Sequence, residues 1–157
     1  MKMFKFFIYL MFTLIPAVSF AFGEKGQWSE GWGMGVSEYQ ATIKPKVTYL
    51  YMACDEYQPV SMAFTHNGKS YGSVVSDIEK GNHFNLIIDG VEIIRPYNTT
   101  SHAEASHFWY FLEKAPKAKK IVLVTNDGKR FNLPLVGIKE HFPETGKDNS
   151  CKTGFEL

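Results

Sequence analysis

The sequence predicts a mainly β fold: an antiparallel β-sandwich or open barrel with one packed α-helix over about residues 101–115. From Gly35 onward, short β-prone runs alternate with turn residues, and three turns contain an Asn-Gly or Asp-Gly pair, at 67–68, 89–90 and 127–128. Such pairs suit type I′ hairpin turns, because both central residues need positive φ, which Gly accepts freely and Asn or Asp tolerate. Three hairpins indicate an antiparallel sheet, and a single strong helix signal places one helix against it.

The first 21 residues have the order of a secretory signal peptide. Lys2 and Lys5 precede an apolar run over residues 6–15, which ends near small residues at 19–21. The run is shorter than the roughly 20 residues that a transmembrane helix needs, so we expect cleavage after Ala21 and no stable membrane insertion. Residues 22–157 then form a single domain in the periplasm or outside the cell.

The stretch from Gly23 to Gly35 is rich in glycine and is the one irregular segment. A mobile arm is one interpretation of it. Its two tryptophans, Trp28 and Trp32, are candidate partner-binding residues, since Trp is enriched at interface hot spots. The alternative is that both rings fold back and cap an open end of the sheet.

The strands follow in order between the turns. The run at 47–54 has apolar residues on both faces and should be central, while Pro134 lacks an amide donor, so its arm is an edge strand or carries a bulge. A short helical turn is expected over 137–141. The predicted strands are Val36–Ile43, Val47–Cys54, Val60–Thr65, Ser70–Val75, Phe84–Ile88, Val91–Arg95, Ile121–Thr125 and Arg130–Val136.

The helix has both a start and a stop signal. Ser101 with Glu104 three positions on forms a capping box, and Pro116 follows as a stop. Trp109 lies at the border of the apolar stripe and is the third candidate partner-binding residue. The stripe itself, which should face the sheet, consists of Ala105, Phe108, Phe111, Leu112 and Ala115.

The two cysteines, Cys54 and Cys151, predict one structural disulfide, because an exported chain meets an oxidising compartment and the even count leaves no thiol over. A catalytic or metal-binding cysteine would need a CxxC spacing or a nearby His, which the sequence lacks.

His102, Glu104 and His107 are candidates for metal binding or acid–base chemistry. Their spacing departs from HExxH, and the capping box also explains Glu104, so the prediction is no metal and no cofactor. The other histidines, His66, His83 and His141, occur in turn-like contexts, where we expect them to be solvated. No GxSxG motif is present.

The charge excludes a role in nucleic-acid binding. Removal of the signal peptide lowers Lys+Arg from 17 to 15 against 16 Asp+Glu, so the mature chain is slightly acidic.

The layout resembles that of small exported bacterial β domains, namely the invasion-associated locus B family and the accessory lipoproteins of type VI secretion. The elements that carry the resemblance are a strand ending in Cys54, a hairpin through Ile87-Ile88-Asp89-Gly90, a helix with Phe108-Trp109 and Leu112, a hairpin ending in Leu133-Pro134-Leu135-Val136-Gly137, and a terminal Cys151. This chain lacks the second cysteine pair of many members of the first group and the lipid-bearing cysteine of the second. The resemblance implies a non-enzymatic periplasmic β-sandwich and leaves its partner open.

These observations lead to three hypotheses. The first is a binding protein that contacts an envelope or secreted protein, as an inhibitor, an immunity protein or an accessory of a secretion apparatus. The second is a small hydrolase or metal-dependent enzyme that uses the helix from His102 to His107. The third is a cell-wall carbohydrate binder with exposed aromatic rings.

Overall fold

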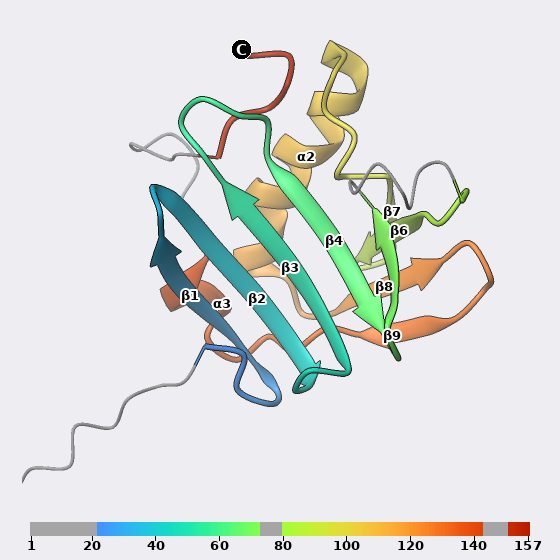
Figure 1. Ribbon diagram of the computed structural model, residues 1–157. Coiled ribbons are helices and arrows are strands. Elements are labelled where there is room, and N and C mark those ends of the chain that lie inside the picture. Colours follow the sequence, from blue (N-terminus) through green and yellow to red (C-terminus); the bar gives the residue numbers. More distant parts are fainter. Residues whose placement is uncertain (1–21, 73–79, 143–150) are drawn as a thin grey trace, which may run out of the picture.

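The computed structural model describes residues 22–72, 80–142 and 151–157 and shows two antiparallel sheets and a main helix (Figure 1). The five-stranded sheet has the order β1-β2-β3-β4-β5, and the four-stranded sheet has the order β7-β6-β8-β9. The strands are β1 (Gln27–Gly33), β2 (Val36–Lys44), β3 (Thr48–Cys54), β4 (Ser61–His66), β5 (Lys69–Gly72), β6 (Phe84–Ile88), β7 (Val91–Ile94), β8 (Ile121–Thr125) and β9 (Arg130–Asn132), and the helices are α2 (His102–Lys114), the 3-10 turn η1 (Ala115–Lys117) and α3 (Ile138–His141). The predicted mainly β fold with one packed helix is confirmed.

The Asn-Gly and Asp-Gly turns form hairpins, but not all of one type. Asn67 and Gly68 have φ values of 49° and 77°, and Asp89 and Gly90 have 48° and 91°, as a type I′ turn requires. At the third hairpin only Gly128 has positive φ, and the Thr125 N–H donates to the Lys129 carbonyl across a three-residue loop. The type I′ prediction is wrong for that turn, because Asn126 lengthens the loop by one residue.

The interpretation of residues 23–35 as a mobile arm is also wrong. Residues 27–33 form β1, which pairs with β2 along its whole length, from Gln27↔Thr42 to Gly33↔Val36. The connection is a two-residue turn in which Met34 and Gly35 have φ values of 53° and 86°. This segment is therefore an edge strand, and its hairpin signal was missed because methionine is not a turn-forming residue.

The core lies between the two sheets and α2. Phe64 on β4 joins the sheets, with its ring centroid 4.8 Å from that of Phe131 and 6.5 Å from that of Phe84. The apolar stripe of α2 is buried as predicted, and Phe111 packs edge-on against Phe142. The largest fully buried side chains are Trp28, Tyr71, Phe64, Phe84, Phe108, Phe111, Leu50, Met52, Met62, Leu86, Ile121 and Leu123.

The segment after β9 ties the two sheets together at their edges. β9 ends at Asn132, two residues before Pro134, so the predicted strand to Val136 is too long. Its backbone turns to β1 instead: the Val136 carbonyl accepts from the Trp28 N–H at 2.8 Å, and the Pro134 carbonyl accepts from the Trp28 indole N–H at 2.8 Å. α3 then forms where the helical turn was expected.

The end of the chain is fixed by the predicted disulfide between Cys54 and Cys151, whose Cα atoms are 4.4 Å apart. Beside it, the Val60 N–H donates to the Lys152 carbonyl, and the Phe155 N–H donates to the Thr99 carbonyl. The disulfide thus holds the C-terminal segment against the β3–β4 loop and the start of α2.

Two predicted features lie outside the described residues: the signal peptide over 1–21, and the part of the strand Ser70–Val75 beyond Gly72. In the described part of the chain, no helix is long and apolar enough to cross a membrane.

Candidate functional site

The Glu104 carboxylate serves the start of α2. Its own backbone N–H donates to Ser101 Oγ at 3.3 Å, and the Ser101 hydroxyl donates back to Glu104 Oε2 at 2.9 Å, which completes the predicted capping box. Thr100 Oγ1 also donates to Oε2 at 3.1 Å, and Asn98 Nδ2 donates to Oε1 at 2.5 Å. Both carboxylate oxygens are therefore engaged in holding the 98–101 loop on the helix.

The histidines of this helix do not join Glu104 in a common site. His102 packs edge-on against Trp109 and Phe155, at 5.6 Å and 5.0 Å between ring centroids, and His107 is half-buried. Across the residues that the structure describes, no three His, Cys, Asp or Glu side chains are placed to hold a metal ion. Trp109 is half-buried in the same aromatic cluster, 6.3 Å from Phe155.

The two N-terminal tryptophans have opposite environments. Trp28 is 1% exposed and packs edge-on against Phe142, so it matches the alternative of a ring folded into the core and is not available to a partner. Trp32, four residues on along the same face of β1, is 76% exposed. It extends past the end of the core because β1 continues beyond α3.

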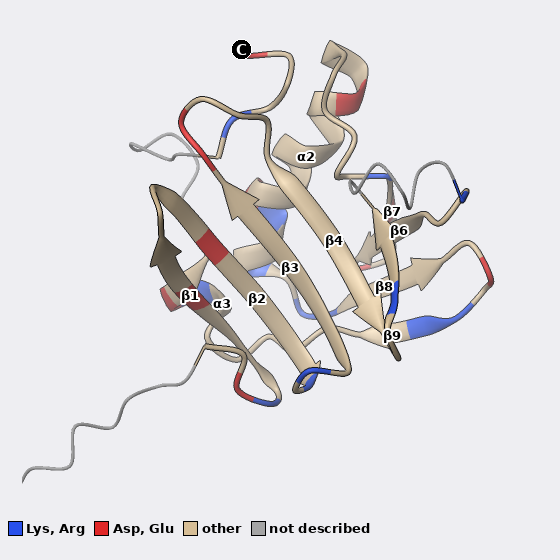
Figure 2. Cartoon of the chain, viewed as in Figure 1, with Lys and Arg blue, Asp and Glu red and all other residues tan. Residues whose placement is uncertain are grey.

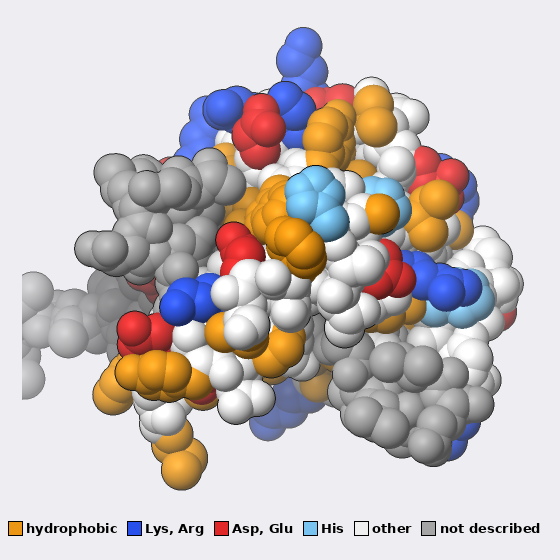
Figure 3. Space-filling view, turned by 90° about the horizontal axis from the view of Figure 1, so that it is seen from above, with side chains coloured by type: hydrophobic (Ala, Val, Ile, Leu, Met, Phe, Trp, Pro, Cys, Tyr) orange, Lys and Arg blue, Asp and Glu red, His pale blue; other side chains and the backbone are white. Residues whose placement is uncertain are grey.

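Trp32 belongs to a surface that we call the loop end of the five-stranded sheet. The register Trp32↔Ser37↔Cys54 places the β1–β2 turn beside the β3–β4 loop, both at the top of the sheet in Figure 1. Met34 in the turn is 100% exposed, and Tyr57 in the loop is 75% exposed. Seen from above, hydrophobic side chains project at the corner of the molecule where this hairpin lies (Figure 3).

From Gln27 to Ile43 the β1–β2 hairpin, like the β3–β4 loop, carries only acidic charges, while Lys152 of the C-terminal segment lies beside Val60 at the end of that loop. The chain contains no Lys or Arg from Gln27 to Ile43 or from Val47 to Gly68, whereas Glu30, Glu38, Asp55 and Glu56 fall in these stretches. Figure 2 shows red on β1, on β2 and on the β3–β4 loop. The Tyr51 hydroxyl donates to Glu38 Oε1 at 2.5 Å, and the pKa of Tyr51 is raised by burial first and by this carboxylate second. The Tyr51 phenol therefore stays neutral, and Glu38 contributes its negative charge to this surface.

Met34 occupies a backbone position that does not suit it. Its φ of 53° is close to those of Asn67 and Asp89, which hold the same position in the other two-residue turns. Non-glycine residues other than Asn and Asp rarely adopt this region. At the first position of the turn, the β1–β2 hairpin therefore has a fully exposed methionine, whereas two other hairpins of the chain have Asn or Asp there.

A family model named YfjT matches residues 26–142. The chain belongs to the YfjT family. The matched region begins one residue before β1 and ends with the residue after α3, so the β1–β2 hairpin is part of the YfjT domain, while Cys151 lies beyond the match. No curated protein and no solved structure matches the chain.

The sequence analysis named Trp32 as a candidate in this YfjT domain but did not name the exposed Met34 and Tyr57. A signal for Met34 was present: Trp28, Glu30 and Trp32 alternate with Ser29, Gly31 and Gly33 up to a Met-Gly pair, which is the pattern of a strand entering a tight turn. No sequence pattern indicated that Tyr57 is exposed, because an aromatic residue in a loop can be buried in the core or lie on the surface.

Proposed function

We propose that this YfjT-family protein is an exported, non-enzymatic binding protein whose loop end contacts another protein. The carrying observation is the pair Trp32 and Met34, 76% and 100% exposed at the tip of one hairpin. Large apolar side chains that project together mark interaction sites more often than single exposed residues do.

The tip is rigidly supported, which favours a binding role. β1 is paired with β2 to its last residue, and Trp28 at the other end of β1 is locked in the core by its ring contact and its indole hydrogen bond. The disulfide at Cys54 fixes the neighbouring loop. A binding loop that is ordered before association loses less conformational entropy on binding.

The chemistry of the surface defines the partner. Apolar side chains at the centre need an apolar cleft, and the surrounding carboxylates favour a partner with Lys or Arg around that cleft. The disulfide and the N-terminal signal pattern support a partner in the periplasm or outside the cell. Binding of this kind would serve an inhibitor of a hydrolase or toxin, an immunity protein or an accessory of a secretion apparatus.

The test is quantitative capture with matched variants. Residues 22–157 would be immobilised under non-reducing conditions as wild type, Trp32→Ala, Met34→Ala and Tyr57→Ala, with Val91→Ala as control, because Val91 is 50% exposed but lies on the other sheet. Proteins bound from a periplasmic extract would be quantified by mass spectrometry. We expect one protein to be retained by wild type and Val91→Ala and to lose at least about tenfold in affinity with Trp32→Ala. Equal retention by all five proteins would overturn the proposal.

A carbohydrate binder would use the same exposed rings of Trp32 and Tyr57. We favour a protein partner because Met34, the most exposed side chain at the tip, is apolar but offers no ring for a sugar to stack on. Titration of wall fragments while tryptophan fluorescence is recorded separates the two: a saturable change lost in Trp32→Ala would replace the protein partner with a glycan.

A further inference from the structure

We infer that the protein also has a small-molecule site, a pocket between the β3–β4 loop and the residues that flank β6 and β7, which takes a ligand carrying a carboxylate. The pocket has a volume of about 830 Å³. It lies between the β3–β4 loop, the residues that precede β6 and the 95–100 loop that leads from β7 to α2. This size falls within the range of pockets that hold small organic ligands.

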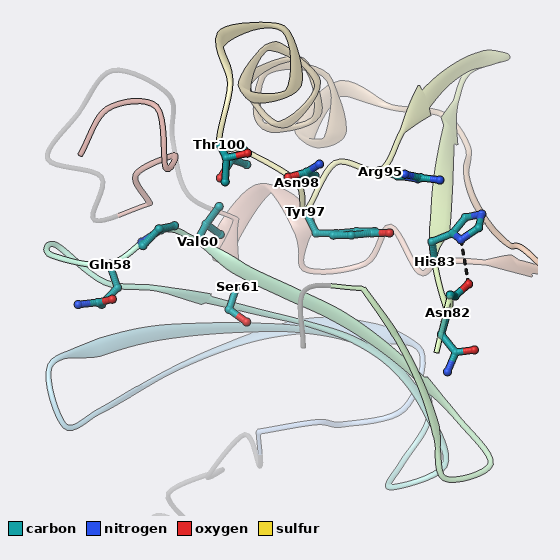
Figure 4. A pocket seen from close by; sticks show the side chains of 12 residues that line it. Gln58, Val60, Ser61, Asn82, His83, Arg95, Tyr97, Asn98 and Thr100 are labelled. Atoms are coloured by element: carbon teal, nitrogen blue, oxygen red, sulfur yellow. Dashed lines mark hydrogen bonds between the residues drawn. The ribbon is translucent and has the colours of Figure 1, made fainter. Parts of the chain in front are cut away.

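The charge of the lining is one-sided. No Asp or Glu occurs among the described residues that line the pocket, whereas Arg95 does. In the described part of the chain Arg95 has no ion-pair partner. Figure 4 shows Arg95, His83 and the Tyr97 hydroxyl toward one side of the pocket. A guanidinium with a further donor beside it recognises a carboxylate by charge and by paired hydrogen bonds.

The polar groups beside Arg95 are held in place. His83 Nδ1 lies 3.0 Å from the Gly81 carbonyl, to which the ring must donate, so Nε2 of the neutral imidazole is an acceptor that faces a hydroxyl or N–H group of the ligand and not its carboxylate. Tyr97 is 7% exposed, and burial is the main cause of its raised pKa, so its hydroxyl keeps its proton. Its ring packs 5.0 Å from Phe84 in the core.

Arg95 itself is held in a strained backbone conformation. Its φ is 43°, and it precedes Pro96, which disfavours helical conformations for the residue before it. The other non-glycine residues with positive φ in the described chain all lie in hairpin connections, whereas Arg95 begins the loop from β7 to α2. The strain is maintained because Asn85 Oδ1 accepts from the Arg95 N–H at 3.2 Å and the Arg95 carbonyl accepts from the Asn98 N–H at 2.9 Å. Such strain is concentrated at functional sites.

The other side of the pocket is uncharged. Val60 and Thr100 lie there, across from Arg95 (Figure 4). The rim at Asn98 and Thr100 is fixed, because both side chains donate to Glu104. The ligand is therefore a molecule with a carboxylate at one end and a neutral body, a description that fits an acidic sugar and a short peptide with a free carboxyl end.

Isothermal titration calorimetry with matched pairs tests this site. One pair is N-acetylmuramic acid and its carboxamide, and the other is acetyl-alanyl-alanine and its C-terminal amide, so that each pair differs in the carboxylate. We expect one acid to bind at least about tenfold more tightly than its neutral counterpart and Arg95→Gln to abolish that preference. The control is Arg130→Gln, which removes an exposed arginine of β9 that does not line the pocket.

The outcomes separate the two possible sources of the carboxylate. Binding of the acidic sugar alone assigns a glycan, and binding of the dipeptide alone assigns a peptide end. Absence of binding by both acids at millimolar concentration, or an equal loss with Arg95→Gln and Arg130→Gln, would overturn the inference. Trp32→Ala should leave ligand binding unchanged, so this test does not depend on the protein contact.

Discussion

Met34 illustrates at the scale of one residue how this protein trades stability for an exposed side chain. The left-handed region costs most L-residues about 1 kcal/mol, and Asn and Asp tolerate it best because their side chains bond the local backbone. Two of the hairpins follow that rule with Asn67 and Asp89, and the β1–β2 hairpin does not. Since Met34 is 100% exposed, its side chain makes no packing contact that would offset the strain.

Met34→Asn should therefore raise the free energy of unfolding by about 0.5–1 kcal/mol and weaken partner binding at the same time. Urea unfolding followed by circular dichroism measures the first effect, and the capture assay measures the second. Met34→Ala is the control, because it removes the side chain but keeps a residue that is strained at this φ. A stabilised Met34→Asn that retains the partner fully would show that the side chain has no role in binding.

At the scale of elements, the junction of α3 with β1 explains why Trp28 is buried while Trp32 is not. The N-cap of α3 is Gly137, whose φ is 76° and where an added Cβ would lie 2.7 Å from the Trp28 carbonyl oxygen. This close approach brings Phe142 onto the Trp28 ring. Beyond it, Phe22 lies against Gly31, while Trp32 and Met34 at the end of the hairpin stay exposed.

Gly137→Ala should cost more stability than Gly128→Ala. Both glycines have positive φ, 76° and 82°, but a Cβ at Gly128 meets nothing within 4 Å. Gly128→Ala should lose about 1 kcal/mol of stability through backbone strain alone. Gly137→Ala adds a clash with backbone atoms that costs roughly 1–3 kcal/mol more. Urea midpoints of the two variants measure the difference. Equal losses would mean that α3 can shift away from β1 without cost.

At the scale of the whole molecule, the disulfide is the longest covalent constraint, with Cys54 and Cys151 separated by 97 positions. It connects the end of β3 with the C-terminal segment, whose backbone also bonds Val60 and Thr99. These contacts lie beside both the loop end and the pocket, so the constraint supports the two proposed sites together.

Replacement of both cysteines by Ser should lower the free energy of unfolding by up to about 4–5 kcal/mol, the loop entropy for a closure of this length. The unfolded state is the main origin of the effect, so the variant should keep its β circular dichroism spectrum while its urea midpoint falls. A reductant should produce the same shift in wild type and none in the variant. An unchanged midpoint in the double variant would show that the bridge contributes no stability.

Local chemistry determined the hairpins at 67–68 and 89–90, the limits of α2 and the pairing of the two cysteines, because turn φ preferences, the capping box and an even cysteine count act over a few residues or leave no alternative. The tertiary structure alone decided the rest. Trp28 and Trp32 lie on the same face of β1. Their exposure differs because the segment of α3, more than a hundred residues away in sequence, covers Trp28 and leaves Trp32 open. Likewise His83 and Arg95 were isolated residues in the sequence, and they share a pocket because the topology places the start of β6 and the end of β7 beside the β3–β4 loop. Such proximity depends on how the sheets pack, which no local pattern encodes.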